Sequence, residues 1–201
     1  MRLGKLTSHD FSQDRPGEGT PSPVILLTGL SGAGKTTLCR ALACQLRDRH
    51  WLVAVIDGDD LRRTVCADLG FKRKDREENL RRIGQIANHL SSHCDVVLIA
   101  AIAPYRQSRG ELRHSIPKYL EVFVNAPLEV CIRRDPKGLY RKALAGEIPR
   151  FTGVGDGYES PIAPDIECNT DRETIQASVD KIVQRLISFC NSRNHEVASH
   201  E

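Results

Sequence analysis

Residues 29–37 carry a pattern that binds polyphosphate anions. The run fits G-x-x-x-x-G-K-[ST] and reads Gly29, Leu30, Ser31, Gly32, Ala33, Gly34, Lys35, Thr36 and then Thr37. Glycines let backbone N–H groups approach phosphate oxygens that a Cβ atom would hold away. Lys35 adds a mobile positive charge near the outer phosphates, and the Thr36 hydroxyl is a natural Mg²⁺ ligand. We therefore predict nucleoside triphosphate binding here, with a catalytic role for Lys35 and Mg²⁺ as the cofactor.

A second group of chemically capable residues follows the next apolar run, 51–56. Asp57 and Asp59 stand two apart, and side chains two apart in an extended segment face the same side. One carboxylate can reach the hydration shell of Mg²⁺ while the other accepts a proton from an incoming hydroxyl group. The alternative is an acidic turn that only caps a helix.

Basic side chains follow on two predicted helical segments. Arg62 stands in the first, and Arg76, Asn79 and Arg82 stand in the second, where Arg76 and Asn79 share a face. Guanidinium groups bind the oxygens of sulfate or phosphate in pairs, so this patch suits an anionic acceptor. A solvated basic helix surface is the alternative.

Two further features lie in loops. Phe71 and Phe151 are two of only five Phe residues, and aromatic faces in loops can sandwich a purine ring. Ordinary hydrophobic anchoring of the loops is the alternative. The segment 135–164 is rich in Gly, Pro and basic residues, and we expect a mobile lid whose cations close over the triphosphate and exclude water. A plain amphipathic surface helix is the alternative there.

The elements that must position these residues alternate along the chain. Apolar runs predict strands at 24–28, 51–56, 95–101, 120–124 and 166–168. Helices are predicted at 35–50, within 60–74, at 75–93, near 107–115, at 127–134 and around 175–186. Asp75 with Glu78 predicts a capping box for the third helix, and Pro127 suits the first turn of the fifth. This alternation predicts a three-layer α/β fold, a mostly parallel sheet flanked by helices.

Composition limits the class of protein. A chain of 201 residues, with 40% hydrophobic and 27% charged residues, predicts one globular domain, at 23–192, between tails at 1–22 and 193–201. The net charge of +3 and the lack of a basic stripe argue against nucleic acid as a partner. No apolar run is long enough to cross a membrane. Seven dispersed cysteines without zinc spacing predict reduced thiols and a cytoplasmic location.

In these motifs the chain resembles the adenylylsulfate kinase family over about residues 20–190. The matching motifs occur in family order at 29–37, 57–62 (Asp-Gly-Asp-x-x-Arg), 70–71 (Gly-Phe), 76–79 (Arg-x-x-Asn), 104–105 (Pro-Tyr) and 135–153. The last of these runs from Asp-Pro-Lys-Gly-Leu-Tyr to Phe-Thr-Gly. The resemblance implies a P-loop kinase that uses ATP and Mg²⁺ to phosphorylate the 3′-hydroxyl of adenylyl sulfate, in sulfate assimilation.

The same resemblance implies a role for each matching residue. Asp59 would be the base for the 3′-hydroxyl, and Asp57 with Thr36 would support the metal. The acceptor would bind to Asp59, Arg62, Phe71, Arg76, Asn79, Ile102, Ala103, Pro104, Lys137, Gly138, Leu139 and Phe151. Among these, Phe71 and Phe151 would stack its adenine, and Lys137 would help close the site. We also expect a homodimer, and a functional link with a separate ATP sulfurylase.

One position departs from the family. Where the family often has Ile-Ser-Pro, this chain has Ile102-Ala103-Pro104. That serine is sometimes assigned as a phosphorylated intermediate, and alanine has no hydroxyl group to phosphorylate. We expect direct in-line transfer, because positioning and electrostatics supply most of phosphoryl-transfer catalysis. The alternatives are an impaired enzyme or nucleotide-binding regulatory module, and a P-loop kinase for another small acceptor.

Overall fold

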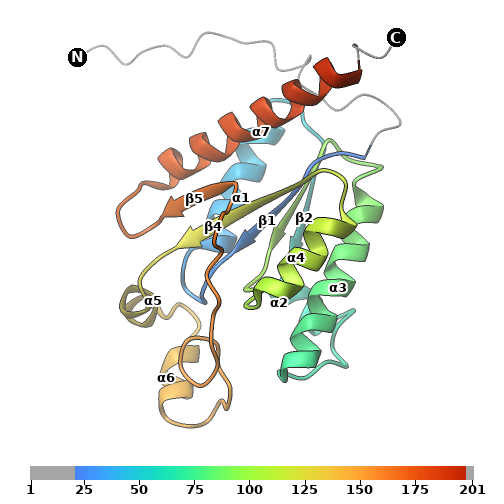
Figure 1. Cartoon of the computed structure of the whole chain (residues 1–201). Helices are drawn as coiled ribbons and strands as arrows, with labels where there is room; N and C mark the ends of the chain where they lie inside the picture. Colours follow the sequence, from blue (N-terminus) through green and yellow to red (C-terminus); the bar gives the residue numbers. More distant parts are fainter. Residues whose placement is uncertain (1–20, 198–201) are drawn as a thin grey trace, which may run out of the picture.

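The computed structural model describes residues 21–197, and a five-stranded sheet forms the centre of this part (Figure 1). Its strands are β1 (Val24–Thr28), β2 (Val53–Asp57), β3 (Val96–Ala100), β4 (Tyr119–Asn125) and β5 (Ile166–Asn169). They lie in the order β2-β3-β1-β4-β5, and every neighbouring pair is parallel. The sheet and its flanking helices confirm the predicted α/β architecture.

Helices cover both faces of this sheet (Figure 1). On one face lie α1 (Lys35–Arg47) and α7 (Ile175–Val197), and on the other lie α3 (Arg73–Leu90) and α4 (Arg106–Ser115). Three shorter helices, α2 (Gly58–Arg63), α5 (Leu128–Arg134) and α6 (Leu139–Leu144), stand in segments beyond the carboxyl ends of the strands. These segments are where parallel sheets gather their ligand-binding groups.

Strand β1 shows why both layers are needed. All five of its residues are buried. Ile25 and Leu27 join the apolar cluster with α1 and α7, whereas Val24 and Leu26 join the cluster with α3 and α4. Because successive side chains of a strand point to opposite faces, a strand that is apolar throughout must be covered on both faces.

Some element boundaries differ from the prediction. Helix α3 begins at Arg73, and the Asp75 carboxylate accepts a hydrogen bond from the Lys72 N–H at 3.0 Å. Asp75 is therefore the third helical residue rather than the N-cap, and the predicted Asp75–Glu78 capping box is wrong. Glu78 instead forms an ion pair with Arg82. The helix ends at Leu90, three residues before the predicted end at 93.

The ends of the folded unit also differ from the prediction. Ser22 is buried and its N–H donates to the Ser91 carbonyl at 2.8 Å, so the folded structure includes this residue of the predicted tail. Helix α7 continues to Val197, past the predicted domain end at 192. The remaining tail residues, 1–20 and 198–201, lie outside the described residues.

Pro127 stands at the N-cap of α5 rather than in its first turn. Across residues 21–197, no helix is both long enough and apolar enough to span a bilayer.

Candidate active site

A cavity of about 1120 Å³ lies beyond the carboxyl ends of the strands. The phosphate loop, α2, the start of α3, residues 100–104 and the segment 134–152 all contribute to its wall. Eighteen predicted site residues line it: Ser31, Gly32, Gly34, Lys35, Thr36, Thr37, Asp57, Asp59, Arg62, Phe71, Arg76, Asn79, Ile102, Ala103, Pro104, Lys137, Leu139 and Phe151. Four others, Gly29, Leu30, Ala33 and Gly138, lie outside the lining, and the two glycines among them serve through their backbone.

Gly29 and Gly138 illustrate this backbone role. A Cβ atom on Gly29 would lie 2.3 Å from the carbonyl oxygen of Val124, so only glycine lets the loop leave β1 against β4. Gly138 has a left-handed backbone with φ of 65° and stands at the N-cap of α6. Glycine adopts that conformation without the steric cost that a Cβ atom brings.

Carbonyl groups of the phosphate loop accept hydrogen bonds from side chains inside and outside the loop. Lys35 Nζ donates to the Leu30 oxygen at 2.7 Å, and Thr170 Oγ1 donates to the Ala33 oxygen at 2.7 Å. Arg134 Nη1 donates to the Gly32 oxygen at 3.3 Å. The loop ends at the N-terminus of α1, whose first N–H groups have no acceptor within the helix. Donors are therefore offered to an anion at this point.

Sequence reasoning missed the residues that brace this loop. Arg134 also donates to the Thr170 carbonyl oxygen at 2.7 Å, and both residues line the cavity. Tyr140 Oη donates to the Ser31 carbonyl oxygen at 3.0 Å. Tyr140 belongs to the Asp-Pro-Lys-Gly-Leu-Tyr motif, but no local motif marks Arg134 or Thr170, and each of the three acts on a backbone group more than 30 positions away.

The Lys35 ammonium group is the charged centre of the loop. Desolvation by the surrounding protein lowers its pKa from 10.5 to about 8, while the charge of Asp59 acts in the opposite direction. Bound polyphosphate would add negative charge beside the ammonium group and would raise this pKa again.

We predict that MgATP binding at pH 8 is accompanied by uptake of about half a proton, because the free group is half protonated at its pKa and the bound group is fully protonated. By the same linkage, ATP affinity decreases as the pH rises above that value. Calorimetry in two buffers of different ionisation enthalpy measures the uptake. Lys35→Arg should show none, since guanidinium stays charged. Equal binding enthalpies in both buffers for the native chain would refute the assignment.

The side chains of Asp57 and Asp59 have different partners in the structure. Asp57 Oδ2 accepts a hydrogen bond from Thr36 Oγ1 at 3.1 Å, which links β2 to the phosphate loop. Its other oxygen, Oδ1, accepts from the Asp59 N–H at 2.9 Å and caps α2. The capping alternative therefore holds for Asp57, together with its contact to the loop. The Asp59 side chain is 57% exposed and forms an ion pair with Lys137.

In the part of the cavity wall formed by α2 and the start of α3, Arg62 and Arg76 lie beside an exposed aromatic ring. Phe71 is 58% exposed, and the Arg62 guanidinium lies 4.6 Å from the centre of its ring. Arg62 Nη1 also donates to the Gly70 carbonyl oxygen at 2.8 Å. Asn79 is 9% exposed, and within residues 21–197 its Oδ1 is buried without a hydrogen-bond partner. Arg62, Phe71 and Asn79 all line the cavity, so this wall offers charge, an aromatic face and an unused acceptor atom.

Arg76 joins this wall to the segment 150–152. Its Nε donates to the Phe71 carbonyl oxygen at 3.0 Å, and its Nη2 donates to the Arg150 carbonyl oxygen. Its Nη1 donates to Thr152 Oγ1 at 2.7 Å. The side chain is only 9% exposed. Arg76 therefore positions the lid candidate as well as facing the cavity.

The structure corrects the expectation for Arg82 and shows how Phe151 and the segment 135–164 are packed. Arg82 does not line the cavity, because its guanidinium is bound to Asp68 and Glu78 on the outer side of α3. Phe151 is only 9% exposed, and its ring packs edge-on against Tyr140 at 5.0 Å. Phe151 therefore anchors its segment on Tyr140 and also lines the cavity, so its stacking on an adenine ring stays a prediction, while Phe71 is the exposed ring. The segment 135–164 contains one short helix, α6, rather than a long amphipathic one.

Comparison with known proteins places these features in a family. The family model described as adenylylsulphate kinase matches residues 21–169, which include the phosphate loop, Asp57, Asp59 and the wall residues Arg62, Phe71 and Asn79. The chain belongs to the adenylylsulphate kinase family. The adenylyl-sulfate kinase of Rippkaea orientalis is 54% identical over 162 residues, covering 81% of this chain and 90% of the relative. That of Chloroflexus aurantiacus is 50% identical over 163 residues, covering 81% and 88%.

Solved structures of the family have the same fold. The Mycobacterium tuberculosis APS kinase CysC, solved in complex with AMPPNP and APS, is 39% identical with a TM-score of 0.79, covering 83% of this chain and 98% of that one. A gluconokinase from Sinorhizobium meliloti is 19% identical with a TM-score of 0.53, covering 90% and 98%. This second likeness concerns the fold alone.

Proposed function

We propose that this adenylylsulphate kinase family member transfers the γ-phosphoryl group of ATP to the 3′-hydroxyl of adenylyl sulfate, giving 3′-phosphoadenylyl sulfate and ADP. The observation that carries the proposal is a single cavity that joins the phosphate loop to Asp59 and to the Arg62–Phe71–Asn79 wall. The relatives bear the matching name at about 50% identity, and the M. tuberculosis structure contains an ATP analogue together with APS.

In this proposal the cavity holds both substrates for an in-line displacement. The Asp59 carboxylate accepts the proton of the 3′-hydroxyl, and the alcohol oxygen forms its bond to the γ-phosphorus. The bond from that phosphorus to the β–γ bridging oxygen breaks, and ADP leaves with the electron pair. Lys35 and the N–H groups at the start of α1 offset the negative charge on the transferred group. Phe71 stacks the acceptor's adenine, and Arg62 holds its anionic groups.

The donor set fits Mg²⁺. The oxygens of Thr36 and Asp57 lie 3.1 Å apart beside the phosphate loop, and Mg²⁺ prefers a few oxygen ligands of this kind together with phosphates and water. Thr36 and Asp57 would hold the ion. When bound, it neutralises charge on the β- and γ-phosphate oxygens.

Ala103 carries no hydroxyl group, and the proposed transfer needs none at that position. The test is ADP release and product formation by the purified chain with MgATP and adenylyl sulfate, measured beside Ala103→Ser. We expect turnover by the native chain and no essential gain from the serine. Turnover only in Ala103→Ser would contradict direct transfer. Equal ADP release with and without acceptor would indicate a regulatory nucleotide-binding module, and turnover of gluconate or a nucleoside instead would indicate another acceptor.

The proposed function is accompanied by proposals for the location, the oligomeric state and the lid of this protein. We propose a cytoplasmic homodimer that works in sulfate assimilation beside a separate ATP sulfurylase, the enzyme that makes its acceptor. The dispersed, odd set of seven cysteines supports a reducing compartment. We also propose that residues 135–164 act as a mobile lid; the Lys137–Asp59 and Arg76–Arg150 contacts support its closed position over the cavity, since they join that segment to α2 and α3.

A further inference from the structure

The cavity wall after strand β3 contains a residue in an unfavourable backbone conformation. Ala103 has φ of 44°, in the left-handed region that a residue with a Cβ atom rarely adopts. It is 7% exposed and lines the cavity between Ile102 and Pro104. Such a conformation persists only where surrounding contacts impose it.

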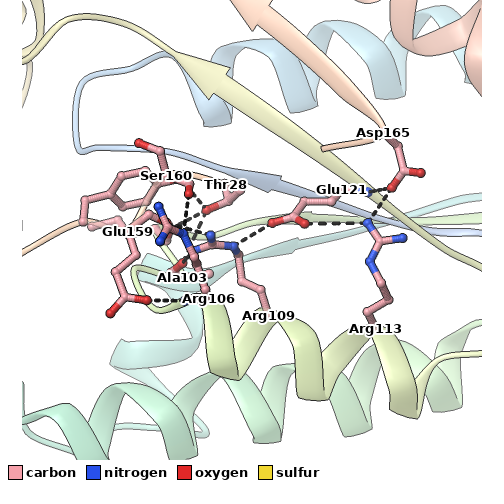
Figure 2. A network of polar contacts seen from close by, with 11 residues as sticks. Thr28, Ala103, Arg106, Arg109, Arg113, Glu121, Glu159, Ser160 and Asp165 are labelled. Carbon is pink, nitrogen blue, oxygen red and sulfur yellow. Dashed lines mark hydrogen bonds and ion pairs between the residues drawn. The ribbon is translucent and has the colours of Figure 1, made fainter. Parts of the chain in front are cut away.

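Arg109, in the second turn of α4, supplies one of these contacts (Figure 2). Its Nη1 donates to the Ala103 carbonyl oxygen at 2.7 Å, and its Nη2 donates to the Glu159 carbonyl oxygen at 2.7 Å. Its Nε donates to Glu121 Oε1 on β4 at 2.6 Å. The Arg109 side chain is 3% exposed. One buried guanidinium group thus joins α4 to Ala103, to strand β4 and to Glu159, which lies 50 positions away.

Arg106 and Arg109 hold residues 103–104 and 159–160 together. We call these two arginines and the four residues that they join the Arg109 clamp. The Glu159 N–H donates to the Pro104 carbonyl oxygen at 2.8 Å, and its Oε2 accepts from the Arg106 N–H at 2.8 Å. Arg106 Nε donates to the Ser160 carbonyl oxygen at 2.8 Å (Figure 2). The clamp therefore ties residues 103–104 of the cavity wall to the C-terminal part of the 135–164 segment.

The geometry requires arginine in particular. A planar guanidinium group presents donors on three separate nitrogens, here toward a carboxylate and two carbonyl groups, whereas the three N–H donors of lysine share one nitrogen on a flexible stem. A lysine at 109 keeps the positive charge beside buried Glu121, so the ion pair can survive while the two carbonyl bonds are lost.

We propose that Arg109 is a positioning residue for the acceptor. It holds the main chain at Ala103 in its left-handed conformation and fixes the wall that the acceptor must contact, while it touches neither substrate itself. This proposal rests on the proposed function for the identity of the acceptor. Among the described residues, Thr28 is the link between the clamp and the phosphate loop: it precedes Gly29, and its Oγ1 donates to the Ile102 carbonyl oxygen at 2.6 Å and lies 3.5 Å from the Ala103 carbonyl oxygen. The hydrogen bonds of Arg109 itself go to Ala103, Glu121 and Glu159, so we expect its replacement to act mainly on the acceptor.

The test compares Arg109→Lys with Arg113→Lys. Arg113 lies one turn further along α4 and pairs with Asp165 and Glu121, but it does not contact residues 103–104 or 159–160. For Arg109→Lys we expect KM for adenylyl sulfate to rise at least about tenfold, with KM for ATP within about twofold of the native value. Arg113→Lys should leave both constants near native. Equal increases of both constants in Arg109→Lys, or an increase in neither, would overturn the proposal.

Hydrogen exchange separates the clamp from the proposed function. Without any substrate, Arg109→Lys should exchange faster than native at the amides of Arg106 and Glu159, and Arg113→Lys should not. Unchanged exchange there overturns the clamp. If the native chain does not phosphorylate adenylyl sulfate, the proposed function fails and the exchange result alone decides the clamp. If Arg109→Lys does not fold, Arg109→Met combined with Glu121→Met takes its place, because removing both buried charges leaves neither unpaired.

Discussion

Replacing Asp59 with asparagine is expected to lower kcat by about 10²- to 10⁴-fold, the usual contribution of a positioned general base. Asparagine has nearly the same shape but cannot accept the proton of the 3′-hydroxyl. ATP binding should be retained, because Asp59 does not contact the phosphate loop and its partner Lys137 belongs to the 135–164 segment. Steady-state kinetics with both substrates, together with calorimetry of a non-hydrolysable ATP analogue, measure the two effects.

The fold should be nearly unaffected by this change. The Asp59–Lys137 pair has side chains that are 57% and 53% exposed, and exposed pairs contribute about 0–1 kcal/mol to stability. Asp68→Asn is the matched control, since this exposed carboxylate pairs with Arg82 outside the cavity. Undiminished turnover in Asp59→Asn would place the base elsewhere, and a loss in Asp68→Asn of similar size would indicate a general effect of surface charge.

Replacing Arg76 with lysine is expected to lower kcat/KM for the acceptor by roughly 10²- to 10⁴-fold. Arg76 donates hydrogen bonds to the Phe71 carbonyl, the Arg150 carbonyl and Thr152. A lysine ammonium group can replace about one of these three, and hydrogen bonds from charged groups contribute about 1.5–3 kcal/mol each. The wall at Phe71 and the segment 150–152 would then no longer be joined. Initial rates at varied acceptor concentration measure the loss.

Arg82→Lys is the control for that measurement. Both arginines lie on α3 and keep their charge as lysine, but Arg82 faces Asp68 and Glu78 rather than the cavity. We expect kcat/KM for Arg82→Lys to stay within about threefold of the native value. Similar losses in the two variants would mean that the basic patch acts only through its net charge.

The sequence did not predict which side chains face the cavity, because their orientation depends on contacts between distant segments. Arg76 and Arg82 look alike in sequence, and only the packing of α2 and α3 directs one to the cavity and the other to Asp68. Phe71 and Phe151 likewise look alike, yet one ring is exposed and the other packs on Tyr140. Arg134, Thr170 and Arg109 carry no motif, because their partners are carbonyl groups that any residue could provide.

The sequence by itself determined the phosphate loop, the parallel sheet and the family. Each depends on local rules: glycines where backbone must approach an anion or another strand, and apolar runs where both faces of a strand are covered. Tertiary structure alone decided which arginine lines the cavity, that Asp57 both caps α2 and binds Thr36, and that Ala103 adopts a left-handed backbone. The physical reason is that these properties depend on hydrogen bonds between segments far apart in the chain, and local residue types do not specify such pairings.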